Sequence, residues 1–319
     1  AAPFSKTKTA VVLATLVLAG ACAQVPAQQS YSEQYAAPAP QYSVYPPQYE
    51  QPQYSQSPDA APQQPYPDQG QYGEQPPDLA EPEGAAMQPL SAGDLEQLLA
   101  PIALYPDNLL AQILAASTYP AQVAAADGWL HGMQAQGYNS PDQIAAGADA
   151  QTGWDPSVKA LTAFPQVLDM LNQNLQWTTA LGNAYYNQPD DVMQTVQVLR
   201  QRAQQAGNLQ DTPQEDVTDD QGYLDVEPTN PDVVYVPAYD PWYAYGAPLM
   251  PYPGFYCAAA ANPFWGIRFG FGIGLGAFHR MPWGWGGWGV SWYSRSILYG
   301  RANYYTRSRS VRDWGFPHG

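Results

Sequence analysis

The sequence has few of the residues that build metal centres and disulfide frameworks. Its 319 residues include two cysteines, Cys22 and Cys257, and three histidines, His131, His279 and His318, that lie far apart in the chain. Because Cys22 falls in a leader segment, no disulfide framework is expected once that leader has been processed. The histidines are too few and too scattered to predict a metal site, and nothing in the sequence predicts a cofactor.

Motifs of the common enzyme families are also missing. The chain has no Gly-x-Ser-x-Gly elbow, no His-Glu-x-x-His helix and no Cys-x-x-Cys pair. Residues 284–289 match Gly-x-Gly-x-x-Gly, but tryptophans fill the gaps and no βαβ unit surrounds them, so we assign no dinucleotide site. We therefore predict no catalytic residue and favour a protein that is not an enzyme.

Acidic residues offer one alternative, a hydrolase of wall glycans or peptides that uses paired carboxylates. The candidates are Asp107, Asp155 and Asp240. Each of them lies at an expected helix start or in an Asp-Pro turn, where an aspartate side chain accepts backbone hydrogen bonds. A capping or turn role is therefore the favoured interpretation of all three.

Long apolar runs are missing as well. Residues 10–19 are apolar and follow Lys6 and Lys8, but a helix of this length reaches only about 15 Å, roughly half of a bilayer core. A transmembrane helix is therefore not expected. A basic stretch followed by a short apolar one is typical of a signal peptide, which we place at residues 1–23.

Two processing routes are open for this leader. Residues 21–23 form a small-x-small site, and cleavage there would leave Gln24 as the first residue. Residues 19–22 instead resemble a lipoprotein box with one imperfect position, in which Cys22 would receive the lipid. A lipidated Cys22 followed by Ala23 favours the outer membrane, by resemblance to known sorting signals. Both routes predict export to the periplasm.

Basic residues are absent from residues 24–89, which hold fourteen prolines, eight tyrosines and eight acidic residues. A segment of this composition buries too little apolar surface to offset the entropy of ordering it. We predict a disordered tether that holds the rest of the chain away from a membrane. The alternative is a self-associating tract formed by its tyrosines.

Residues 90–208 show the period of amphipathic helices, interrupted by prolines. Residues 91–94 form a capping box, and Asp-Pro, Ser-Pro and Phe-Pro pairs mark further helix starts. In the last helix, Val196 and Leu199 lie on one side and Gln197 and Arg200 on the other. We predict a compact bundle of short helices that is large enough for its own core.

The chain changes character after the helices. Residues 209–222 are acidic without a basic residue, and we interpret them as a linker. Residues 223–228 alternate in polarity and residues 232–241 are β-branched and aromatic, with a Pro-Thr-Asn-Pro turn signal between them. We therefore expect these two segments to pair as a hairpin. A lone hairpin is marginal in water, so residues 223–260 should dock on the helices.

Residues 261–319 form a Gly-, Trp- and Arg-rich basic tail. They contain seven arginines and one acid, whereas the preceding residues contain five basic residues and 27 acids. Tryptophan, tyrosine and arginine are common at binding surfaces and at membrane interfaces. The candidate partner-binding residues are Trp283, Trp285, Trp288, Trp292, Arg295 and Arg301.

Residues 263–292 allow two interpretations. Glycines recur four residues apart over residues 266–274, a spacing that suits close helix packing in a membrane. Glycines also recur two residues apart over residues 270–276, with apolar residues between them, which favours flexible or β-like structure. We favour the second interpretation because Arg268 lies inside the run and its uninterrupted part is too short to span a bilayer.

Five segments together resemble a known family. They are residues 98–107, 109–120, 154–159, 164–168 and 227–241, and the last of these is the most specific. Their order resembles a family of bacterial exported proteins described as domain of unknown function 3300, over roughly residues 90–245 and a looser tail. The resemblance implies a fold region and export, and it carries over no catalytic residue.

The sequence thus predicts a mainly α fold, a compact bundle of short proline-delimited helices with an attached small β hairpin, flanked by disordered or irregular N- and C-terminal arms. We expect an exported cell-envelope protein, periplasmic or anchored in the outer membrane through Cys22. It would be a non-enzymatic binding or assembly module near a membrane, with peptidoglycan, an anionic lipid or another envelope protein as its partner, and not nucleic acid. The alternatives are the hydrolase and a self-assembling subunit driven by the Gly/Trp-rich tail.

Overall fold

A computed structural model describes residues 88–257 and 266–315, which all belong to one unit of the chain, Gln75–Gly319. The leader, the lipid-attachment candidate Cys22 and the tether up to residue 87 lie outside the described residues. The expectations for those segments therefore stay predictions.

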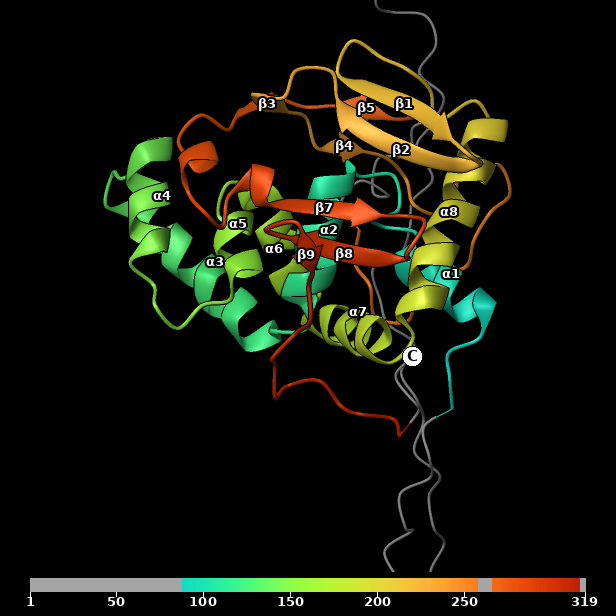
Figure 1. Ribbon diagram of the computed structural model, residues 1–319, viewed down its shortest axis with the longest axis horizontal. Coiled ribbons are helices and arrows are strands. Elements are labelled where there is room, and N and C mark those ends of the chain that lie inside the picture. Colours follow the sequence, from blue (N-terminus) through green and yellow to red (C-terminus); the bar gives the residue numbers. More distant parts are fainter. Residues whose placement is uncertain (1–87, 258–265, 316–319) are drawn as a thin grey trace, which may run out of the picture. The chain divides into compact units, whose positions relative to one another are not determined.

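The described part of the chain contains eight α-helices, as the proline-interrupted pattern predicts (Figure 1). They are α1 (Ala92–Leu99), α2 (Asp107–Ser117), α3 (Pro120–Ala135), α4 (Pro141–Asp149), α5 (Pro156–Leu161), α6 (Pro165–Gln173), α7 (Leu175–Asn187) and α8 (Pro189–Gln205). Five of them have proline in their first turn, where its missing N–H costs no helical hydrogen bond. Ser91 and Ser140 close capping boxes at α1 and α4. The mainly α fold is confirmed.

Helix α2 lies at the centre of the core. Residues 109–117 are all buried, because α3, α5, α7 and the sheet of the C-terminal segment pack around this helix. Helix α7 comes so close that a Cβ atom placed on Gly182 would lie 2.2 Å from the carbonyl oxygen of Ser117. The approach of these two helices therefore requires glycine at position 182.

Strands β1 (Glu215–Asp220) and β2 (Tyr223–Pro228) form an antiparallel hairpin. The expected pairing of residues 223–228 with residues 232–241 is therefore wrong, and the segment interpreted as an acidic linker supplies a strand. The reason is the turn at Gln221 and Gly222, whose φ angles are 55° and 92°. A two-residue turn with positive φ at both positions matches the twist of paired strands.

The hairpin docks on α8, as a hairpin that is marginal on its own should. The side-chain amide of Gln197 accepts a hydrogen bond from the backbone N–H of Leu224 at 2.8 Å and donates one to its carbonyl oxygen at 3.1 Å. Gln197 and Arg200 are 5% and 0% exposed. Strand β2 therefore covers the part of the polar side of α8 that carries Gln197 and Arg200, while Gln194 stays exposed.

Residues 232–241 pair with the C-terminal segment instead. Strand β3 (Val233–Val234) pairs with β6 (Ile273–Gly274), and β4 (Pro237–Ala238) pairs with β5 (Arg268–Phe269). The described residues between positions 266 and 276 contain no helix, so the glycine spacing there belongs to extended and turn structure. In residues 88–257 and 266–315, no helix has both the length and the apolar character that crossing a membrane requires.

The described part of the predicted tail is irregular, with short elements, and it is folded onto the helices. Its elements are the 3₁₀ turns η2 (Phe278–Arg280) and η3 (Trp285–Gly287) and the sheet strands β7 (Trp288–Ser291), β8 (Ser296–Tyr299) and β9 (Ala302–Asn303). Figure 1 shows this sheet, in red, lying across α2. Phe278 and the tryptophans at positions 283, 285, 288 and 292 of this segment belong to the same core as the helices.

Candidate functional site

Arg200 of α8 is a fully buried charged residue with four hydrogen bonds. Its Nε and Nη2 donate to the carbonyl oxygens of Ala103 and Tyr105, each at 2.9 Å. Its Nη1 donates to Oδ1 of Asp107 at 2.6 Å and to the carbonyl oxygen of Leu224 at 2.7 Å. Arg200 therefore joins α8 to the start of α2 and to β2.

Asp107 extends this network to the C-terminal segment. Its Oδ2 accepts a 2.8 Å hydrogen bond from the indole Nε1 of Trp292, whose ring centre lies 4.8 Å from the Arg200 guanidinium carbon. Asp107 is 7% exposed and both of its oxygens have donors. The expected capping role of Asp107 is wrong, because Pro106 is the N-cap of α2 and no side chain caps this helix. The carboxylate of Asp107 instead links α2 to Arg200 and Trp292, so the network accounts for this residue by its contribution to the fold.

The other two aspartates considered for a hydrolase also have structural partners. Asp155 accepts hydrogen bonds from the backbone N–H and the hydroxyl of Ser157 at 2.9 and 2.6 Å, at the start of α5. Asp240 is 4% exposed and accepts one from the backbone N–H of Trp242 at 2.9 Å. These contacts match the capping and turn roles that the sequence favours for both residues.

Glu215, the first residue of β1, is a second buried acid in the field of Arg200. It is 2% exposed, and its Oε1 has no hydrogen-bond partner among the described residues. Burial raises the pKa of the Glu215 carboxyl to about 8, against the opposing effect of the Arg200 charge. Burial therefore favours the protonated form of this side chain.

The four tryptophans predicted to bind a partner lie in the core. Trp283, Trp285, Trp288 and Trp292 are 4, 6, 4 and 5% exposed. The indole Nε1 of Trp283 donates to Oδ1 of Asp149 at 2.8 Å, and that of Trp288 donates to the carbonyl oxygen of Trp283 at 3.0 Å. Partner binding by this segment stays a prediction, and in this fold a binding surface would be built from other side chains.

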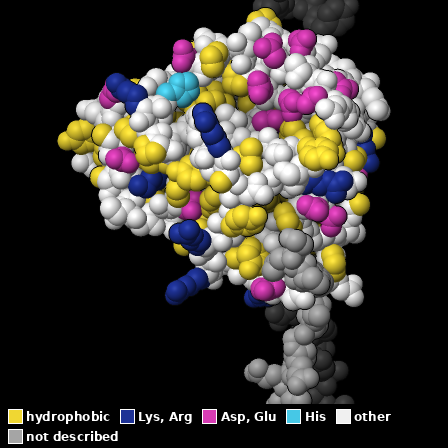
Figure 2. All heavy atoms as spheres, in the orientation of Figure 1, with side chains coloured by type: hydrophobic (Ala, Val, Ile, Leu, Met, Phe, Trp, Pro, Cys, Tyr) yellow, Lys and Arg dark blue, Asp and Glu magenta, His cyan; other side chains and the backbone are white. Residues whose placement is uncertain are grey.

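The predicted arginines lie at turns on either side of β8. Arg295 and Arg301 have φ angles of 51° and 70°, and Arg301, Arg307 and Arg309 are exposed. In the described ranges no carboxylate forms an ion pair with any of these four arginines. Figure 2 shows basic side chains spread over the face that carries β7, β8 and β9, a group of acidic side chains over the β1–β2 hairpin, and further acidic side chains scattered among the basic ones.

A cavity of about 360 Å³ lies between α6, the chain around β4 and residues 255–257. Asn174 fixes the position of Tyr256 in the cavity lining. The side-chain amide of Asn174 accepts a hydrogen bond from the backbone N–H of Tyr256 at 2.7 Å and donates one to its carbonyl oxygen at 3.1 Å. The lining combines aromatic rings with a polar rim and includes Tyr105, Tyr239, Phe255, Gln166, Asp169 and Gln173. This size and this mixed lining suit a small ligand.

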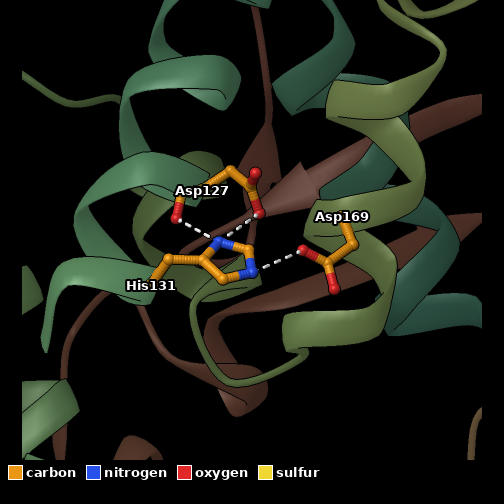
Figure 3. A group of neighbouring side chains, drawn as sticks. All are labelled: Asp127, His131 and Asp169. Atoms are coloured by element: carbon orange, nitrogen blue, oxygen red, sulfur yellow. Dashed lines mark hydrogen bonds and ion pairs between the residues drawn. The ribbon is translucent and has the colours of Figure 1, made fainter. Parts of the chain in front are cut away.

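Beside this cavity, Asp127 and His131 of α3 and Asp169 of α6 point toward one another (Figure 3). The imidazole Nδ1 lies 3.0 Å from the carbonyl oxygen of Asp127 and 3.6 Å from its Oδ1, and Nε2 lies 3.4 Å from Oδ1 of Asp169. Ligand atoms of the three side chains lie within 4.8 Å of one another. One residue of this group, Asp169, also lines the cavity.

The negative surroundings change the acid–base properties of this group. The hydrogen bond to the Asp127 carbonyl, with the charges of Asp127 and Asp169, raises the pKa of His131 above its ordinary value. Burial, with the neighbouring Asp127 carboxylate, raises the pKa of Asp169. A positive charge among these side chains is therefore favoured.

Sequence reasoning, which found the histidines too scattered for a metal site, missed this group. The four-residue spacing of Asp127 and His131 on one helix was a readable signal, because such residues are neighbours on a helix face. Asp169 was not predictable in the same way, since only the packing of α6 against α3 brings it there.

Comparison with known proteins gives a family and no activity. The family model described as protein of unknown function (DUF3300) matches residues 91–314. The uncharacterized protein YacH of Escherichia coli (strain K12) is 38% identical over 188 residues, which cover 49% of this chain and 30% of that protein. The matched part of this chain therefore spans less than a third of the length of that relative. No solved structure matches the chain.

Proposed function

We propose, on the premise that this chain belongs to the DUF3300 family of proteins of unknown function, that it is an exported binding protein of the cell envelope. The folded body is the binding module, and its partner is an anionic envelope component, either peptidoglycan or an anionic lipid surface. The proposal assigns the protein no catalytic activity.

The observation that carries this proposal is the set of exposed arginines in the C-terminal segment. Arg301, Arg307 and Arg309 are exposed, and no carboxylate in the described residues neutralises them. Among the described residues, many acidic side chains gather over the β1–β2 hairpin, and the others on this face form no ion pair with these three arginines (Figure 2). Exposed arginines that no carboxylate pairs with attract anionic partners at a distance and orient them on contact.

Export supports the choice of partner. The basic and apolar leader at residues 1–23 favours a periplasmic chain, and a lipid on Cys22 would hold it at the outer membrane. Nucleic acid is not expected in that compartment. Another envelope protein with an acidic surface would satisfy the same arginines, and the experiment below includes that outcome.

Cosedimentation tests the proposal. The full chain and the triple variant Arg301→Gln, Arg307→Gln, Arg309→Gln are mixed with purified peptidoglycan, with vesicles that contain anionic lipids, and with neutral vesicles. We expect the wild type to sediment with one of the two anionic materials, more weakly as salt rises, because exposed charges are screened. The triple variant should lose most of this binding.

The matched control replaces the same three arginines with lysine, which keeps the charge and should keep most of the binding. Equal sedimentation of the glutamine variant and the wild type would remove the arginines from the proposal. Binding to neither anionic material, with retention by an acidic envelope protein, would move the proposal to a protein partner.

The two alternatives have less support from the geometry. The hydrolase candidates have structural partners: Asp107 pairs with buried Arg200, Asp155 caps α5 and Asp240 forms a turn contact. Self-assembly through the Gly/Trp-rich tail would need exposed indoles, and Trp283, Trp285, Trp288 and Trp292 are buried.

A further inference from the structure

We propose that Asp127, His131 and Asp169 form a binding site for a divalent transition-metal ion that takes mixed imidazole and carboxylate ligands. This inference goes beyond the proposed function and rests on none of the arginines that carry it. Zn²⁺ is the natural probe, because it is bound in proteins by histidine nitrogen and carboxylate oxygen.

The tautomer of His131 is fixed in the way that metal-binding histidines require. Its Nδ1 lies 3.0 Å from the carbonyl oxygen of Asp127, so Nδ1–H donates there and the lone pair of the neutral ring is on Nε2. A hydrogen bond from the second ring nitrogen to a backbone carbonyl is a usual support for a metal-bound histidine. The ring therefore presents Nε2 as a ligand.

The partner of Nε2 is spaced as a second ligand. Nε2 lies 3.4 Å from Oδ1 of Asp169. Two ligands at metal distances of about 2.0–2.1 Å and a tetrahedral angle are separated by about 3.4 Å. In the neutral tautomer both atoms are acceptors, so they repel each other unless a cation lies between them.

Asp127 supplies the third ligand and the strongest sign that the group is incomplete. Asp127 is 6% exposed, and its Oδ1 has no hydrogen-bond partner among the described residues. Its Oδ2 accepts a 2.8 Å hydrogen bond from the side-chain amide of Asn172, which orients the carboxylate toward His131. A buried carboxylate oxygen without a donor is unfavourable, and a metal ion would satisfy it.

The packing of α3 against α6 brings the three side chains together and leaves those of His131 and Asp169 accessible. Asp127 and His131 are neighbours on α3, and α6 packs along that helix and presents Asp169. The side chains of His131 and Asp169 are 58% and 37% exposed. Three protein ligands leave a tetrahedral ion one open position, which water or an anionic ligand from the adjoining cavity could fill.

A proton is the competitor of the metal ion. A protonated His131 would also offset the two carboxylates, and proton and metal require the same lone pairs. Metal affinity should therefore fall as pH decreases.

Calorimetric titration of the full chain, freed of metal with EDTA and transferred to clean buffer, tests the site with Zn²⁺. We expect the variants His131→Gln and Asp169→Asn to lose one high-affinity site per chain. Because cysteine also binds Zn²⁺, the site is defined by the difference between wild type and these variants, and Asn172→Ala should weaken it by about tenfold or more.

The matched control is His279→Gln. His279 lies 3.4 Å from Asp232 but belongs to no cluster of three ligands among the described residues, so this variant should bind Zn²⁺ as the wild type does. Melting curves check that the variants fold, and Zn²⁺ should raise the melting temperature of the wild type more than that of His131→Gln. Equal Zn²⁺ binding by wild type and His131→Gln, or no binding by the wild type, would show a histidine–carboxylate ion pair only and overturn the proposal.

Discussion

The Nη1 atom of Arg200 in α8 donates a 2.6 Å hydrogen bond to Oδ1 of Asp107, the first residue of α2, 93 positions earlier in the chain. The Arg200 side chain is fully buried and that of Asp107 is 10% exposed. Buried charges of this kind are tolerated only when paired and fully hydrogen-bonded. The central helix, the last helix and the hairpin are therefore expected to fold as one cooperative unit.

Removing the charge of Asp107 should show how much depends on this pair. Asp107→Asn leaves Arg200 buried without a counter-charge, and we expect the free energy of unfolding to fall by about 3–5 kcal/mol. The control is Glu96→Gln, which breaks the pair with Arg202, a side chain that is 42% exposed. Urea denaturation should show a loss of less than about 1 kcal/mol for the control. Equal losses in the two variants would mean that the buried Arg200–Asp107 pair contributes no more to stability than the more exposed Arg202–Glu96 pair.

The tryptophans of the C-terminal segment should behave as core residues. Trp288→Ala removes a ring that is 4% exposed, and we expect a loss of about 3–5 kcal/mol in the free energy of unfolding. Tyr293→Ala, in the same segment but 87% exposed, should change it by no more than about 0.5 kcal/mol. Thermal melts followed by circular dichroism compare the two, and similar curves would mean that the segment does not complete the core.

Glu215 should make the protein less stable as pH rises. Its folded pKa of about 8 exceeds the ordinary value of 4.5, so the folded state holds a proton that the unfolded state has lost. The contribution of Glu215 to the free energy of unfolding is fully present below pH 4.5. Above that pH it decreases by up to about 1.4 kcal/mol per pH unit, and it is lost as pH rises through the folded pKa.

The variant Glu215→Gln cannot ionise, so its free energy of unfolding should vary less between pH 5 and pH 8. Denaturation at a series of pH values measures this slope. Asp216→Asn, an exposed neighbour on the same strand, should keep the wild-type slope. A Glu215→Gln variant with an unchanged slope would mean that this carboxyl is ionised in the folded protein.

Two glycine-to-alanine substitutions should have opposite effects. Gly182→Ala places a methyl group 2.2 Å from the carbonyl oxygen of Ser117, so α7 and α2 must separate and the melting temperature should fall. Gly128→Ala on α3 meets no atom within 4 Å and should stabilise the helix by about 0.5–1 kcal/mol. If both raised the melting temperature, the close approach of α7 and α2 would be wrong.

The helix starts were predictable because their causes are local. Ser91 and Ser140 cap their helices through residues three positions away, and Asp155 does so through a residue two positions away. The hairpin was predictable only in part. The alternation of residues 223–228 marks a strand, but the acidic composition of residues 215–220 hides the partner that a two-residue turn brings back.

The candidate metal group was also predictable only in part. Asp127 and His131 share a helix face, and that half can be read from their spacing in the sequence. Asp169 and the supporting amide of Asn172 come from another helix, and no pattern within α3 points to them.

The sequence by itself determined where the helices begin, that they are short, and that basic and acidic residues lie in different parts of the chain. Only the tertiary structure decided that Arg200 and the four tryptophans are buried, that the acidic segment supplies a strand, and that Asp169 meets Asp127 and His131. The physical reason is the distance along the chain between the residues that determine each feature. A helix cap depends on neighbours within one turn, whereas the exposure and partners of a side chain depend on segments that can lie a hundred residues away.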